Sequence, residues 1–345
     1  MIKKSIVLHI IYILALPILL CNCGGGSGDI DLKSVKLDLD LKRFEKSLFE
    51  VRSVDDVMQL KEEFPIFYEV YLNNIMPQGP AVYSMSQVDK AMELYRYVSH
   101  PDMDSLYKLT QQKYGDFEDY REELEKAAKR IKYYFTDEEI TEAVTFVSSF
   151  EYGSVFLEDN KVFAIGLDMY MGRDFEVYPL LDPAKFPFYR ISRFEPHYIV
   201  PNSVKSFLYY KSNSGEGNSF IDEAIAEGKI LYAMDKLLPH TPDSLKISYA
   251  DGQIEWCVAN EENIWAYLVQ EDILFSTDKN DFTSKFFNDG PFTTPFGNES
   301  SPRVGAWVGW QIVREYMQRN PEVDLSTLLA DEDHQKIFKE SRYKP

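Results

Sequence analysis

The sequence has few cysteines and histidines, and it lacks the common catalytic motifs. Its 345 residues include three cysteines and five histidines, without His-Glu-x-x-His or Cys-x-x-Cys. These absences exclude a zinc site built on either motif. A P-loop, Gly-x-Gly-x-x-Gly and Gly-x-Ser-x-Gly are also missing, so the sequence predicts no glycine-rich phosphate cradle and no nucleophile elbow. We therefore expect no metal and no cofactor.

Positive charge is scarce as well. Lysine and arginine number 37 against 56 acidic residues, which gives a formal net charge of −19. Nucleic-acid-binding proteins are usually basic, so we expect no nucleic-acid partner. An acidic surface also keeps a soluble domain dispersed.

The N-terminus has the pattern of a bacterial lipoprotein signal peptide. Two lysines precede an apolar run over residues 6–20, which is too short to span a membrane comfortably. Cys23 follows the small Asn22, and we expect it to carry acyl chains such as palmitate after cleavage. Cys21 is the alternative lipidation site, although it would place the bulky Leu20 at the cleavage position. An ordinary signal peptide or an uncleaved anchor remains a further interpretation.

Beyond the signal peptide, residues 1–22, we expect a flexible tether over 23–34 and one compact domain over 35–345. Its first part, 42–134, is predicted to be helical. The second part, 135–345, is predicted to combine a small sheet with helices. Strands are indicated by period-two alternation from Val35 to Leu41 and by a hairpin over 155–168. The predicted fold is mainly α with a small antiparallel sheet.

One long helix over Asn218–Leu238 is expected at the centre of this fold. Asn218 or Ser219 can cap its start, and Pro239 stops it. Its apolar residues occupy two opposite faces, as in a helix with neighbours on both sides. A second apolar helix, 305–317, carries the small residues Gly305, Ala306 and Gly309, which permit close packing.

The same central helix carries the candidate catalytic residues. Asp222, Glu223 and Glu227 form a possible acid/base set, with His197 as a further candidate. The alternative is that these carboxylates are paired or solvated. Cys257 is interpreted as a buried small apolar residue. The many aromatic residues either fill the core or bind glycans by stacking.

Several segments together resemble the gliding-motility lipoprotein family GldB of Bacteroidetes. They cover most of the chain after Cys23 and are RFEKSLFE (43–50), HYIVPNSVKSFLYY (197–210), DEAIAEGKILYAMDKLLP (222–239), Trp256 with NEENIW (260–265), PFTTPFG (291–297), GAWVGWQIVREYMQRNP (305–321) and IFKESRYKP (337–345).

This resemblance implies a lipid-anchored protein of the cell envelope, associated with motility and secretion. We expect it to bind an envelope protein partner without catalysis, at the periplasmic face of the outer membrane. The layout is also similar to a degenerate zincin metallopeptidase, in which Glu227 would match a zinc-binding glutamate. That similarity implies the alternative function, a hydrolase using Glu227 with Glu223 or His197. A glycan- or peptidoglycan-binding module is a third hypothesis.

Overall fold

A computed structural model describes residues 30–76, 84–212 and 218–345. Residues Leu32–Pro345 group into one unit by their internal contacts. The predicted signal peptide, Cys21, Cys23 and most of the tether lie outside the described residues. No helix of the described segments is long and apolar enough to cross a membrane.

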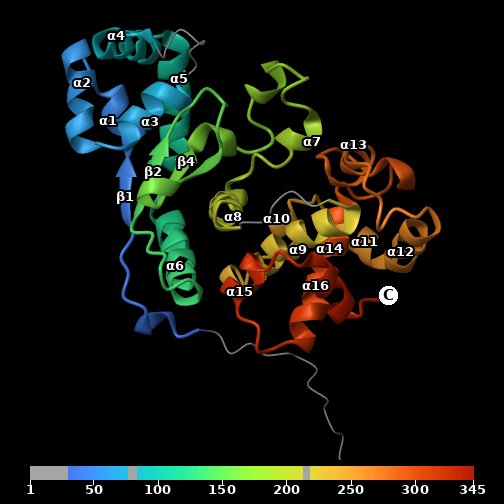
Figure 1. Cartoon of the computed structure of the whole chain (residues 1–345). Helices are drawn as coiled ribbons and strands as arrows, with labels where there is room; N and C mark the ends of the chain where they lie inside the picture. Colours follow the sequence, from blue (N-terminus) through green and yellow to red (C-terminus); the bar gives the residue numbers. More distant parts are fainter. Residues whose placement is uncertain (1–29, 77–83, 213–217) are drawn as a thin grey trace, which may run out of the picture. The chain divides into compact units, whose positions relative to one another are not determined.

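Helices account for most of the described chain (Figure 1). Those before the second strand are α1 (Phe44–Phe49), α2 (Val54–Glu63), α3 (Phe67–Val70), α4 (Gln87–Val98), α5 (Pro101–Tyr114) and α6 (Glu118–Tyr134). Those after the last strand are α7 (Phe188–Ile191), α8 (Ile199–Lys211), α9 (Phe220–Leu237), α10 (Asp243–Ile247), α11 (Gln253–Ala259), α12 (Glu261–Gln270), α13 (Lys279–Phe282), α14 (Val304–Arg319), α15 (Leu325–Ala330) and α16 (His334–Ser341).

The sheet is mixed, not antiparallel as predicted. Its strands are β1 (Asp40–Arg43), β2 (Glu142–Phe146), β3 (Ser154–Leu157) and β4 (Val162–Gly166), in the order β1-β2-β4-β3. The β3–β4 pair is the predicted antiparallel hairpin. β2 pairs in parallel with both β1 and β4, since long connections bring the chain back to the same end of the sheet.

The first strand is shorter than the sequence pattern predicts. β1 begins at Asp40, and the preceding residues Leu37 and Leu39 are buried without joining the sheet. The backbone N–H of Leu39 instead donates to the Glu125 carboxylate at 3.3 Å. The alternating leucines therefore reflect an extended segment that packs against α6.

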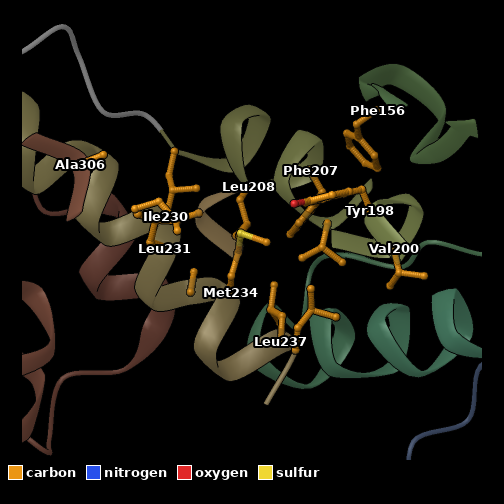
Figure 2. Packing of buried hydrophobic residues seen from close by; sticks show 14 of the residues in the cluster. Phe156, Tyr198, Val200, Phe207, Leu208, Ile230, Leu231, Met234, Leu237 and Ala306 are labelled. Carbon is orange, nitrogen blue, oxygen red and sulfur yellow. The ribbon is translucent and has the colours of Figure 1, made fainter. Parts of the chain in front are cut away.

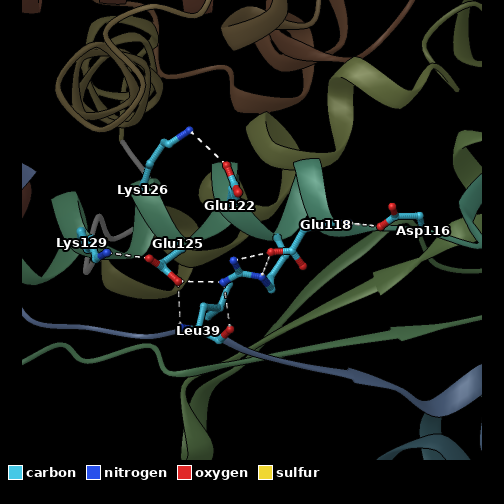
Figure 3. Close-up of polar contacts among 8 residues, drawn as sticks. Leu39, Asp116, Glu118, Glu122, Glu125, Lys126 and Lys129 are labelled. Carbon is cyan, nitrogen blue, oxygen red and sulfur yellow. Dashed lines mark hydrogen bonds and ion pairs between the residues drawn. The ribbon is translucent and has the colours of Figure 1, made fainter.

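The exposed side of α6 carries the ion pairs expected from its charge pattern (Figure 3). Glu125 pairs with Lys129 at 2.5 Å and with Arg121 at 2.8 Å, and both partners lie one turn away. Glu125 thus joins a solvated helix face to the N-terminal segment through Leu39.

Side chains of the sheet alternate between two hydrophobic cores. Val144 and Phe146 of β2 point into a smaller core with α1–α4, whereas Ala143 packs in the larger core. In β4 the members of the smaller core are Val162 and Ala164, and the larger core takes Phe163 and Ile165. This period of two follows from strand geometry.

The central helix α9 lies in the larger core, as predicted. It starts after Ser219, whose Oγ and backbone N–H form a reciprocal capping box with Asp222. It contacts α6, α8, α14, α15 and α16. Figure 2 shows apolar residues of α8 and α9 in this core, among them Leu208 and Met234.

Glycines allow α9 and α14 to approach closely, as expected from the sequence. A Cβ atom added to Gly309 would lie 1.6 Å from the Ala224 carbonyl oxygen. One added to Gly228 would lie 2.3 Å from the carbonyl carbon of Gly309. Neither position has room for a side chain, so the two backbones form the contact.

Candidate functional site

The acid/base set predicted on α9 is divided between different roles. Asp222 accepts the Ser219 N–H at 3.1 Å in the capping box, and it also accepts from Gln335 Nε2 at 2.8 Å. Glu223 is half-buried in the first helical turn. Asp222 is therefore occupied in starting the helix.

Glu227 lies further along α9, half-buried, beside Tyr209 of α8. The Tyr209 hydroxyl donates to its two carboxylate oxygens, at 3.2 and 3.4 Å. The predicted partner His197 is not close, because it lies in the 3₁₀ turn Pro196–Tyr198 before α8. Twelve residues separate it from Tyr209, which corresponds to about 18 Å along a helix. His197 is exposed and lines a different pocket, with His240.

The described residues place no group of three His, Cys, Asp or Glu side chains where a metal ion could be held. The zincin-like core is not shown, and the hydrolase alternative that depended on it is not supported. Cys257 is fully buried, as predicted, with Sγ 3.8 Å from the Tyr249 hydroxyl. Burial raises the pKa of the Cys257 thiol to about 11, so little thiolate forms at neutral pH.

The structure instead forms a large groove that the sequence did not predict. Its volume is about 970 Å³. We call it the apolar groove; α4, α5, the turn at 149–150 and the segment 176–181 line it. Its apolar lining residues are Met76, Tyr97, Met103, Leu106, Leu109, Phe150, Val177, Leu180 and Leu181. Such a surface can bind apolar side chains of a ligand.

Backbone strain shapes one wall of the apolar groove. Ser149 and Phe150 have φ angles of 57° and 67°, in the left-handed region that such residues rarely adopt. The buried carboxylate of Asp168 holds this turn, because it accepts the backbone N–H of Phe150 at 2.6 Å and of Ser148 at 3.1 Å. Burial raises the pKa of Asp168 to about 6 against the lowering effect of these hydrogen bonds.

The buried Tyr178 connects the rim of the apolar groove to Asp168. The Tyr178 hydroxyl donates to the Asp168 carbonyl oxygen at 2.8 Å and accepts the Met171 N–H at 2.9 Å. Two residues later Leu180 is 82% exposed. The segment is thus anchored from inside while it presents an apolar side chain to solvent.

Sequence reasoning missed Asp168, although a signal was present. It follows the wholly apolar run VFAIGL at 162–167, and a carboxylate at the end of a buried strand needs partners. The groove itself had no local signal, because its lining residues come from segments far apart in the sequence.

Comparison with known proteins identifies a family. The family model described as gliding motility protein GldB matches residues 26–345. No curated protein and no solved structure matches the chain. The family match covers all of the described residues, including the apolar groove and α9.

Proposed function

The chain belongs to the GldB family and is thus a gliding-motility lipoprotein of the cell envelope. On this basis we propose that it is a non-catalytic component of an envelope motility, secretion or surface-assembly system. It binds a protein partner through the apolar groove. A lipid on Cys23 holds it to the periplasmic face of the outer membrane.

The apolar lining of the groove supports this function. A volume of about 970 Å³ is in the range of ligand-binding clefts. Met76 and Met103 in its lining are flexible and polarisable, as in surfaces that accept varied apolar side chains. Leu180, at 82% exposure, adds apolar area at the rim. Exposed apolar area of this kind marks protein-binding sites.

Charged groups at the rim can orient the partner. Arg96 and Glu93 of α4 pair at 2.6 Å beside the groove, and Asp102 and Glu176 also line it. An amphipathic helix that inserts apolar residues at helical spacing, with polar residues toward this rim, matches the arrangement.

The test is affinity purification of the tagged full chain from membranes in mild detergents. Leu180→Asp places a charge at the groove, and we expect it to lose a partner that the unmodified chain recovers. Val258→Asp is the matched control, because Val258 is 61% exposed on α11 and does not line the apolar groove. Both residues are exposed, so stability should change by only about 0.5 kcal/mol. Equal recovery with Leu180→Asp, or no partner above background for the unmodified chain, contradicts the proposal.

The anchor has a separate test. Cys23→Ser should release the chain from membranes or block its maturation, as measured by fractionation and acyl labelling. Unchanged acyl labelling would instead assign the lipid to Cys21.

A further inference from the structure

One face of α8 is polar and lines a second pocket, separate from the apolar groove. Asn202, Lys205, Ser206 and Tyr209 recur at helical spacing and line this pocket of about 370 Å³, which we call the α8 pocket. The opposite side of α8 is buried in the larger core. The helix therefore holds this polar face rigidly.

Lys205 occupies the α8 pocket without a carboxylate partner in the described chain. Its Nζ donates to Ser248 Oγ at 3.1 Å, and it forms no ion pair with the residues that the structure describes. Desolvation, together with the nearby charge of Arg303, lowers the pKa of Lys205 to about 7 against the raising effect of Glu227. An ammonium group in such surroundings is stabilised by a bound anion.

Three arginines add positive charge at the same place. Arg190 and Arg193 line the pocket, and Arg303 acts on Lys205 by its charge. Arg193 pairs with Asp289, but Arg190 donates to the Lys185 carbonyl oxygen at 2.7 Å and has no carboxylate partner among the described residues.

Arg303 likewise donates to a carbonyl, that of Ile247, and its buried Nε has no hydrogen-bond partner in the described structure. Among the residues that line the α8 pocket, the three cations Arg190, Arg193 and Lys205 stand against one carboxylate, Asp289. Arg303 and Glu227 are not part of that lining and act on Lys205 by their charges. This local excess of positive charge stands in a chain whose net charge is −19.

We propose that the α8 pocket binds a phosphate monoester. The phosphate group lies against Lys205, Arg190 and Arg193, where an ammonium point charge and guanidinium forks suit its oxygens. A phosphate monoester carries about two negative charges at neutral pH, and its binding favours the protonated form of Lys205. This inference goes beyond the partner-binding function and is independent of it, because the α8 pocket and the apolar groove share no lining residue.

The remaining lining residues favour a phosphate attached to an organic group over a bare ion. Asn202, Ser206 and Ser248 offer hydrogen-bonding groups, and the rings of Tyr170 and Tyr198 form apolar wall. The pocket volume of about 370 Å³ exceeds that of a phosphate ion and leaves space for a small polar group such as a sugar or glycerol.

The experiment is calorimetric titration of the folded chain with inorganic phosphate and with glycerol phosphate, at low salt because screening weakens such binding. Lys205→Met should weaken binding at least about tenfold. Lys285→Met is the control, since Lys285 pairs with Asp281 outside the pocket and its loss should leave binding unchanged.

A loss of folding is separated from a loss of binding by two measurements. Lys205→Met removes an ammonium group without an ion-pair partner, so its thermal midpoint should equal or exceed that of the unmodified chain. Arg190→Gln, on α7, should also weaken binding while the chain stays folded.

Retention on vesicles containing phosphatidic acid, lost in Lys205→Met, would identify a lipid headgroup as the source. Glycerol phosphate binding without vesicle retention supports a soluble or glycan-borne phosphate. Absence of saturable binding by the unmodified chain, or equal affinities for it and Lys205→Met, overturns the proposal.

Discussion

The two sides of α9 pack in different ways. Toward α14 the contact is made by backbone, with Gly228 against Gly309 and no space for a Cβ atom. On that side Asp235 accepts from Trp310 Nε1 at 3.0 Å and pairs with Arg314 at 2.8 Å. Toward α8 the apolar contact gives way to half-buried and exposed polar residues, with Glu227 bonded to Tyr209.

We infer from this difference that the α14 side of α9 serves mainly stability and that the α8 side is available for binding. Asp235 also pairs with Lys246 at 2.8 Å. Its carboxylate therefore has charged donors from two residues of the protein, Arg314 and Lys246. Lys205, on the α8 side, has the neutral Ser248 as its hydrogen-bond partner among the described residues. Groups whose partners are incomplete are the ones available to a ligand.

The largest effect is expected where the backbones touch. Gly309→Ala forces a Cβ into the Ala224 carbonyl, so the helices must separate, and unfolding free energy should fall by about 3 kcal/mol or more. Gly305→Ala is the matched control, since its Cβ would meet the Phe287 ring, a side chain that can move. Denaturant unfolding measures both. Equal, small losses would show that α9 and α14 are not held at backbone contact.

An intermediate effect is expected for Asp235→Asn. The change removes the charge that pairs with Arg314 and Lys246, which still have Asp243 nearby at 2.8 and 3.2 Å. We expect a loss of about 1–3 kcal/mol, typical of hydrogen bonds to charged groups. Denaturant unfolding provides the measurement. A smaller loss of unfolding free energy than that of Glu227→Gln would show that the α14 side of α9 is not the more stabilising one.

The smallest effect is expected for Glu227→Gln. Among the described residues its hydrogen-bond donor is the Tyr209 hydroxyl, and Tyr209 is 49% exposed, so unfolding free energy should change by only about 0.5 kcal/mol. Because Glu227 and Asp235 lie on the same helix, the pair makes an internal comparison under identical denaturant conditions. If Glu227→Gln lowered the unfolding free energy as much as Asp235→Asn does, the α8 side of α9 would also be important for stability.

Local chemistry made much of the fold predictable. The capping signal at Ser219 and the apolar periodicity located α9 to within two residues at each end. The small residues of the 305–317 segment indicated its close packing, although Gly228 as the facing glycine was not identified. The hairpin of β3 and β4 followed from two apolar runs around a turn.

The sequence pattern could not predict strand pairing or binding sites that are formed by distant segments. Alternation predicts a strand but gives neither its partner nor its direction, so the parallel pairs of β2 were missed. Asp222 was correctly placed on α9, but its hydrogen bonds in the capping box were not predicted. The α8 pocket combines Arg193, Lys205 and Asp289, which no spacing rule connects.

The parallel pairing of β1 has a consequence for the order of folding. Asp40 pairs with Glu142, so the first strand cannot be completed until about a hundred further residues have been made. Closing so long a loop costs entropy before any sheet contact forms, and such non-local pairing slows folding. Since synthesis starts at the N-terminus, α1–α6 are made before the strand that closes their sheet. Until β2 has been synthesised, the apolar faces of these helices cannot pack against the sheet. A chaperone that covers exposed apolar surface would therefore be needed most during that interval.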